Sequence, residues 1–103
     1  MSMTFKVLEI IDEYTIKVSP NWAWVTPEGK NLIGDKLRIN GYIIPSSYNK
    51  TYAKEKLSRL LINREVILKN PQVINESNIK ISCRVFIDNI DVSHYFPEYK
   101  QMV

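Results

Sequence analysis

The sequence predicts a mainly β domain, a small five-stranded β-barrel packed against one main α-helix. Most of the chain is apolar or alternates apolar with polar residues, which is the period of a β-strand. One stretch, near residues 49–62, instead repeats its apolar residues at helical spacing. A length of 103 residues suffices for one core and not for two, so we expect a single domain over residues 1–103.

The first part of the chain is expected to be extended. Its apolar or alternating segments are residues 5–11, 14–18, 22–26 and 36–44. Asp12 and Glu13 form a turn after the first segment, and the Pro and Gly of residues 27–31 favour a tight reversal. In the last segment, Leu37 and Ile39 share one face.

One α-helix is predicted near residues 49–62. Apolar residues recur there at i, i+4, i+7 and i+8, and these are Ala53, Leu57, Leu60 and Leu61. Ser47 or Asn49 is expected to cap the first turn, because their side chains can accept hydrogen bonds from unpaired backbone N–H groups. Asn63 is expected to end the helix in a left-handed conformation.

Two further strands and a short tail complete the predicted order of elements. Residues 65–70 form a short strand that Pro71 ends, and the polar residues 72–78 form a loop. The next strand has one apolar face, made of Ile79, Ile81, Cys83, Val85 and Ile87. The pair Asp88-Asn89 suits a hairpin turn. In the tail, Ser93 is expected to cap a short helix whose start Pro97 limits. Closing such strands into a barrel removes exposed edges.

Composition narrows the function classes. The net charge of +3 is compatible with a polyanionic partner but does not require one. A single cysteine, Cys83, and a single histidine, His94, offer no cluster of soft ligands for zinc. We also expect no other metal and no cofactor. The sequence contains neither the roughly 20 apolar residues of a membrane span nor a secretory signal. We therefore expect a cytoplasmic protein.

Residues 7–18, 37–46 and 82–85 together resemble segments of staphylococcal-nuclease-like domains. Residues 7–18 are similar to the strand that enters the family's Asp-Gly-Asp-Thr turn. Residues 37–46 are similar to its Arg-Leu-x-x-x-Asp-Thr-Pro-Glu segment, and residues 82–85 to its Tyr-Gly-Arg-Gly. The order and spacing of these segments match the family over most of the chain, whereas each individual motif matches only in part. The resemblance implies an OB-fold barrel.

The resemblance also implies where an active site would lie. Active members hydrolyse phosphodiesters with a calcium ion held by two aspartates, a glutamate that activates water, and two arginines that bind phosphate. In this chain Tyr14 and Ile43 stand where the two aspartates would be, and Ser46 stands where the glutamate would be. The arginines match Arg38 and Arg84. Calcium needs several hard oxygen ligands, so we expect no nuclease activity.

The leading expectation is a non-catalytic OB-fold module that binds nucleic acid, with single-stranded DNA or RNA as its partner. Arg38 and Arg84 would contact phosphates, and Trp22 and Tyr42 would stack on bases. The loss of carboxylates from the cleft would also remove repulsion toward a phosphate backbone.

Two alternatives remain open at this point. The barrel could be an inert scaffold whose exposed aromatic residues or strand edge bind another protein. Alternatively, Asp12, Glu13 or Asp35 could replace the lost ligands and restore a calcium-dependent nuclease. A shift of one residue along a strand turns a side chain to the opposite face, which disfavours this second alternative.

Overall fold

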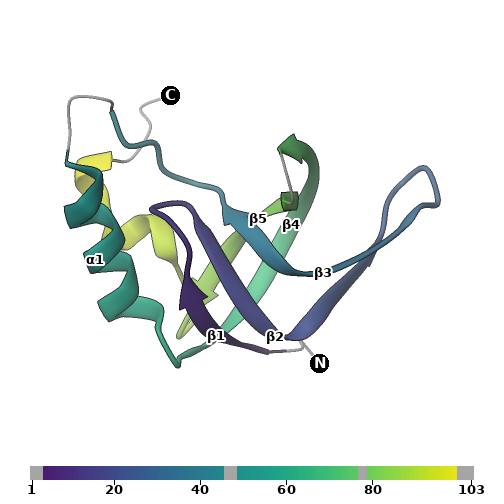
Figure 1. Ribbon diagram of the computed structural model, residues 1–103, viewed down its shortest axis with the longest axis horizontal. Coiled ribbons are helices and arrows are strands. Elements are labelled where there is room, and N and C mark those ends of the chain that lie inside the picture. The colour runs from purple at the N-terminus through teal and green to yellow at the C-terminus, as the bar shows by residue number, and fades with distance from the viewer. Residues whose placement is uncertain (1–3, 46–48, 77–78, 100–103) are drawn as a thin grey trace.

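The computed structural model describes residues 4–45, 49–76 and 79–99 (Figure 1). They form a closed five-stranded β-barrel with one α-helix, which confirms the predicted fold class. The strands are β1 (Phe5–Ile10), β2 (Thr15–Val25), β3 (Asn31–Ile39), β4 (Glu65–Glu76), β5 (Ile79–Ile87) and the short β6 (Ile90–Asp91). The helix is α1 (Lys50–Leu61), and two 3-10 helices follow β6, η1 (Val92–Tyr95) and η2 (Pro97–Tyr99).

A parallel pair between β3 and β5 closes the barrel. The other neighbours, in the order β3, β2, β1, β4 and β5, are antiparallel. Between β3 and β5, Arg38 pairs with Ser82 and Ile39 pairs with Cys83. Two strands that are far apart in the sequence therefore lie side by side, and their polar faces form one continuous outer surface.

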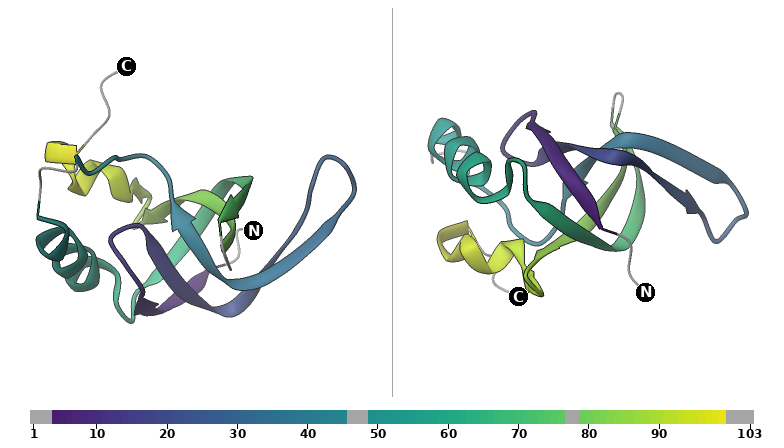
Figure 2. Two further views of the ribbon diagram at one scale, coloured as in Figure 1. Left: turned by 45° about the horizontal axis from the view of Figure 1, so that its top comes forward. Right: turned by 90° about the horizontal axis from the view of Figure 1, so that it is seen from below.

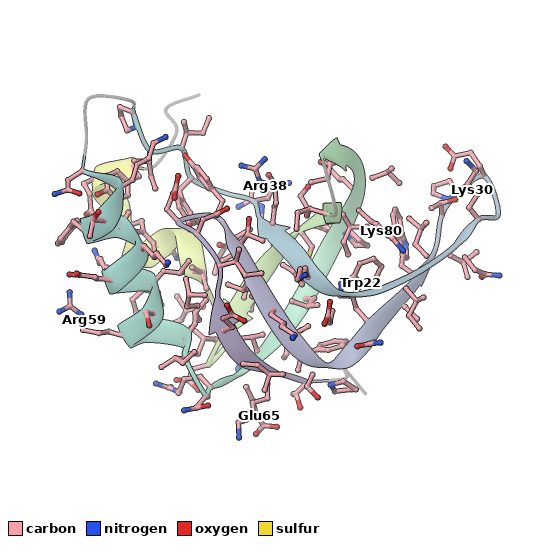
Figure 3. The ribbon with its side chains drawn as sticks, viewed as in Figure 1. Trp22, Lys30, Arg38, Arg59, Glu65 and Lys80 are labelled. Carbon is pink, nitrogen blue, oxygen red and sulfur yellow. The ribbon has the colours of Figure 1, made fainter. Side chains whose placement is uncertain are left out.

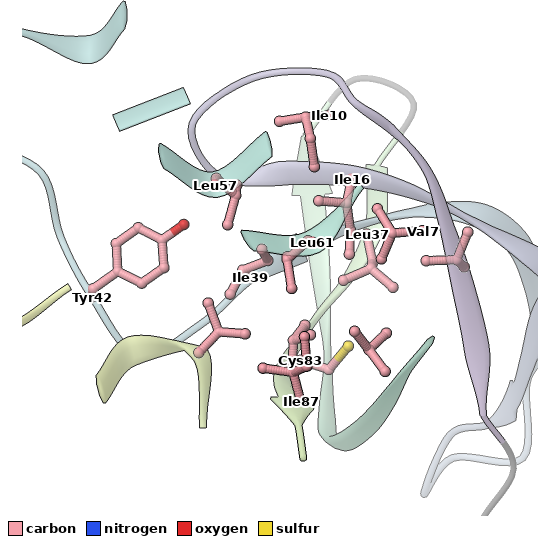
Figure 4. Packing of buried hydrophobic residues seen from close by; sticks show 14 of the residues in the cluster. Val7, Ile10, Ile16, Leu37, Ile39, Tyr42, Leu57, Leu61, Cys83 and Ile87 are labelled. Atoms are coloured by element: carbon pink, nitrogen blue, oxygen red, sulfur yellow. The ribbon is translucent and has the colours of Figure 1, made fainter. Parts of the chain in front are cut away.

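The core fills the barrel and extends under α1. The predicted alternation in β5 is confirmed, since Ile81, Cys83, Val85 and Ile87 are buried. Figure 4 shows Leu57 and Leu61 of the helix packed with the residues that point into the barrel. The helical stripe predicted from the sequence is therefore the face that covers one end of the barrel.

The two ends of the molecule differ. Figure 2 shows α1 and the 3-10 helices at one end, and the hairpin of β2 and β3 projecting from the other end. This projecting hairpin, residues 21–34, is called the arm below. The predicted reversal lies at its tip, where Gly29 takes a φ of +90° and donates a hydrogen bond to the carbonyl of Thr26. None of the helices formed by the described residues is long and apolar enough to cross a membrane.

The predicted ends of the helix are confirmed. The side chain of Asn49 accepts hydrogen bonds from the backbone N–H groups of Thr51 (2.8 Å) and Tyr52 (3.3 Å). Asn63 follows the last turn with a φ of +62°, in the left-handed region. Ser47, the other candidate cap, lies outside the described residues.

Three strand boundaries correct the predictions. β2 is one strand through Pro20, β3 runs over 31–39 rather than 36–44, and β4 continues past Pro71 to Glu76 where a loop was expected. Both prolines lie at register shifts, between Lys17 and Trp22 in β2 and between Lys69 and Gln72 in β4. The missing N–H of a proline is tolerated at such irregularities, so neither proline ends its strand.

The C-terminal turns confirm one prediction and correct another. Asp88 and Asn89 both have positive φ, +52° and +66°, as the tight turn between β5 and β6 requires. The helix cap is Asp91 rather than Ser93, because Asp91 accepts a hydrogen bond of 2.8 Å from the N–H of Ser93. Ser93 is therefore a buried residue inside η1.

Candidate functional site

Most of the polar residues of the candidate site lie where β3 and β5 meet on the outside of the barrel. Residues on the inner faces of both strands, such as Leu37 and Ile81, are buried in the core. Because side chains alternate along a strand, the residues between them face outward. We call this outer face the seam surface, and it consists of Lys36, Arg38, Asn40, Lys80, Ser82 and Arg84. Figure 3 shows Arg38 and Lys80 on this part of the molecule.

An open depression of about 310 Å³ lies on the seam surface. Its lining is Tyr14, Arg38, Ile39, Asn40, Tyr42, Ile43, Ile74 and Ser82. The amide of Asn40 donates a hydrogen bond of 3.3 Å to the hydroxyl of Ser82, and its backbone N–H donates one of 2.9 Å to the carbonyl of Cys83. The floor of the depression is therefore tied across the two strands that close the barrel.

Arg38 lies at the edge of a row of aromatic rings. Its guanidinium carbon is 5.4 Å from the centre of the Tyr14 ring, the geometry of a cation–π contact. Tyr14 stacks on Tyr42 with centroids 5.5 Å apart, and Tyr42 stacks on Phe96 at 4.7 Å. The hydroxyl of Tyr14 accepts a hydrogen bond from the backbone N–H of Ile44. These contacts orient the Tyr14 ring beneath the arginine.

Arg84 lies two residues further along β5 than Ser82, on the same outer face. Its Nη1 atom donates a hydrogen bond of 3.0 Å to Oδ2 of Asp91, and its side chain is 44% exposed. The structure therefore brings the two arginines predicted as phosphate ligands to one surface. Arg38 lines the depression, whereas Arg84 lies beyond its lining.

Trp22 and Tyr42, the predicted base-stacking residues, are each only 3% exposed. The indole of Trp22 donates a hydrogen bond of 2.9 Å to the carbonyl of Lys36 and packs against Gly34. The ring of Tyr42 lies between Tyr14 and Phe96, and its hydroxyl donates to the carbonyl of Glu13. A ring without an exposed face cannot stack on a base, so both residues have packing roles in this conformation.

Two cross-strand pairs of like charge join the seam surface to the neighbouring strands β2 and β4, and sequence analysis did not find them. Lys17 of β2 pairs directly with Lys36, and Lys69 of β4 pairs directly with Arg84. Residues directly opposite each other in adjacent strands have their side chains on one face, with Cβ atoms about 5 Å apart, and like charges there destabilise the sheet. Only the strand register reveals these pairs, so the sequence carries no signal for them.

Nearby groups offset part of this repulsion. Asp35 lies 3.8 Å from Lys17, and the ammonium of Lys69 lies 4.7 Å from the centre of the Phe86 ring. The basic residues nevertheless extend over four adjacent strands, from β2 through β3 and β5 to β4. The arrangement can hold a chain of anionic groups laid across the strands.

The three carboxylates that were considered as substitute calcium ligands have other contacts. Asp12 accepts a hydrogen bond of 2.8 Å from the N–H of Tyr14, Glu13 lies 4.0 Å from Lys50, and Asp35 faces Lys17. Among the described residues, no three His, Cys, Asp or Glu side chains are grouped as metal ligands would be. Ser46 lies outside the described residues. Tyr14 and Ile43, which stand where the resemblance would place the two aspartates, both line the depression.

Cys83 and His94 add no reactive group to the seam surface. Burial in the core raises the pKa of the Cys83 thiol to about 12, so the thiol stays protonated and unreactive near neutral pH. His94 is exposed on η1. Neither residue lines the depression.

Comparisons with protein-family models, with curated proteins and with solved structures found no match for this chain. What the structure shows is a closed, mixed β-barrel with one helix, an architecture consistent with an OB-like fold.

Proposed function

We propose that this chain is a non-catalytic, staphylococcal-nuclease-like module that binds single-stranded nucleic acid on the seam surface. The observation that carries this proposal is the placement of Lys17 against Lys36 and of Lys69 against Arg84. Such pairs lower the stability of the free protein, and a polyanion laid over them would remove the repulsion.

The size of the basic face suits a short stretch of backbone. Neighbouring strands are about 4.8 Å apart, so a path from β2 across β3 and β5 to β4 spans roughly 14 Å. Arg38 lies in the middle of this path and Arg84 near its end. Guanidinium groups pair well with phosphate because their donors form a planar fork.

The depression favours a single strand over a duplex. Ile43 is 52% exposed beside Arg38, and Ile74 lines the same depression. An unstacked base can enter such a partly apolar site, whereas the bases of a duplex are covered by their neighbours. Contact between a base and Ile43 would add to the phosphate contacts.

The absence of catalysis rests on the residues that replace the expected acids. A tyrosine whose hydroxyl accepts a backbone hydrogen bond, and an exposed isoleucine, cannot supply the anionic oxygens that hold calcium. Tyr14 and Ile43 therefore make the depression a binding site without a metal. Incubation of a labelled oligonucleotide with Ca²⁺, compared with EDTA, should give no cleavage above the rate without protein.

Binding is tested by titrating fluorescein-labelled 12-mers of DNA and RNA at several salt concentrations. The logarithm of the association constant should fall linearly with the logarithm of the salt concentration, by about 0.7 for each phosphate contacted. Arg38→Gln should weaken binding and reduce that slope by roughly one phosphate, and Arg84→Gln should do the same.

The matched control is Arg59→Gln, since Arg59 lies on α1, well apart from Arg38 and Lys80 (Figure 3). This variant should bind as the wild type does. Binding that is absent, that is insensitive to salt, or that weakens equally in the control would overturn the proposal.

A protein-interaction module is the second candidate, and the arm is the observation that favours it. Val25 and Ile33 are 60% and 57% exposed on this projecting hairpin. Exposed apolar side chains beside strand edges are typical of surfaces that bind a partner strand. Replacing both residues with threonine should leave oligonucleotide binding unchanged, because neither side chain belongs to the seam surface and the contact of Ile33 with Lys80 is made by its backbone carbonyl.

A further inference from the structure

The guanidinium of Arg84 lies close to the loop after β3 and to the start of η1. The carboxylate of Asp91 contacts it, with Oδ2 at 3.0 Å from Nη1. Gly41 also lies close, since a Cβ atom there would come within 3.1 Å of the same nitrogen and 3.0 Å of the Ser93 Cβ. Gly41 also has a φ of +120°, which L-residues rarely adopt. The close approach of this loop to Arg84 therefore depends on a residue without a side chain.

Asp91 is itself fixed. Its side chain is 10% exposed, and its two oxygens have separate partners, since Oδ2 accepts from Arg84 while Oδ1 accepts from the N–H of Ser93 at 2.8 Å. A carboxylate anchored in this way favours one orientation of the Arg84 guanidinium, while 44% of the Arg84 side chain remains exposed to solvent.

We infer that Asp91 is a positioning residue, which orients the guanidinium of Arg84 to receive a phosphate. This inference rests on the proposed function and adds a residue that does not touch the nucleic acid. A long side chain that is already ordered loses less conformational entropy on binding, and this difference amounts to about a three- to tenfold change in affinity.

A rival role for Asp91 predicts the opposite sign. If its carboxylate simply neutralised Arg84, its removal would release a positive charge and strengthen binding to a polyanion. Asp91→Asn separates the two roles, because asparagine is nearly the same size and is also a favourable helix cap. The direction of the change in affinity therefore distinguishes positioning from neutralisation.

The experiment is a double-mutant cycle on the full chain, with the same labelled single-stranded 12-mer. Asp91→Asn should weaken binding about three- to tenfold in the wild type and leave it unchanged in an Arg84→Gln background. In NMR spectra of the free protein, the Arg84 Nε–Hε group should become more mobile in Asp91→Asn. The urea midpoint of each variant reports separately on folding.

Asp88→Asn is the matched control, because it removes one negative charge from the adjacent turn and Asp88 pairs with Arg64 rather than Arg84. It should not weaken binding. Stronger binding by Asp91→Asn, or an equal loss in the Arg84→Gln background, would overturn the positioning role while the proposed function stands. A wild-type chain that binds no oligonucleotide would instead overturn the proposed function, and the positioning role with it.

Discussion

At the scale of single residues, Lys36 illustrates a conflict between binding and stability. Its side chain faces Lys17 across two antiparallel strands, and the pairing of like charges opposes folding. Lys36→Gln should therefore raise the free energy of unfolding by about 0.2–1 kcal/mol at low salt. The gain should shrink as salt screens the repulsion. The same variant should weaken oligonucleotide binding.

Urea denaturation at low and high salt measures the first effect, and the fluorescence titration measures the second. Lys54→Gln on the exposed face of α1 is the control for removing a lysine, and we expect it to change neither quantity appreciably. A loss of stability in Lys36→Gln would mean that the ammonium groups already avoid each other. The pair of lysines would then give no support to the proposed function.

Gly34 provides a second prediction at the residue scale. A Cβ atom there would come within 2.9 Å of Cζ2 of the Trp22 ring. The buried indole cannot move away easily, because its N–H is hydrogen-bonded to the carbonyl of Lys36. Gly34→Ala should therefore destabilise the protein by about 1–3 kcal/mol, the usual effect of overpacking a core. An unchanged urea midpoint would contradict the packing role of Trp22.

The scale of elements shows which parts of the fold could be predicted from the sequence. The helix, both of its ends and the turn at Asp88 and Asn89 depend on neighbouring residues, and all were predicted. The paths of β2 and β4 depend on where Pro20 and Pro71 meet the adjacent strands. A proline ends a regular strand but is accommodated at a bulge, and the register that creates the bulge is set by distant residues.

The candidate site follows the same division. Arg38 was predicted on the polar face of its strand from alternation alone, and it lies on that face. The burial of Trp22 could not be predicted, because the register shift that precedes it in β2 turns the ring toward the barrel. The pairing of Lys69 with Arg84 could not be predicted either. Alternation of polar and apolar residues shows which face a side chain lies on, but not which residue of the neighbouring strand lies opposite it.

The helix cap gives the prediction at this scale. The side chain of Asn49 satisfies two backbone N–H groups that no helical carbonyl can reach. Asn49→Ala should lower the free energy of unfolding by about 1 kcal/mol, whereas Asn49→Asp should retain most of it. Thermal denaturation of the two variants measures the difference. Equal losses in both would show that the asparagine acts through something other than its capping oxygen.

At the scale of the whole molecule, the modest net charge of +3 hides an uneven distribution. Basic residues face outward together on β2, β3, β5 and β4, where Asp35 and Asp91 each contact one of them, while Asp12 and Glu13 lie in the turn between β1 and β2. The proposed function depends on this local field rather than on the total charge. The arm and α1 lie at the two ends of the barrel (Figure 2), and the arm meets the seam surface where Lys80 donates a hydrogen bond of 3.1 Å to the carbonyl of Ile33.

The pH dependence of stability follows from two groups in the core. Burial raises the pKa of Cys83 from 9.0 to about 12, and burial also raises the pKa of Tyr42 above its ordinary value of 10.0. Above pH 9 the unfolded chain loses the thiol proton while the folded chain keeps it. The contribution of Cys83 is therefore complete below pH 9 and is lost as the pH rises toward 12, by at most about 1.4 kcal/mol per pH unit.

Cys83→Ala separates this effect from the loss of stability that other groups cause at alkaline pH. The variant should be less stable at neutral pH, because it leaves a small cavity. Its stability should nevertheless fall less steeply between pH 9 and 10 than that of the wild type, since one group whose pKa is raised by folding has been removed and Tyr42 contributes equally in both chains. Urea denaturation across this range measures both slopes. Parallel slopes would mean that the thiol ionises equally in the folded and unfolded chains, and that solvent reaches the centre of the barrel.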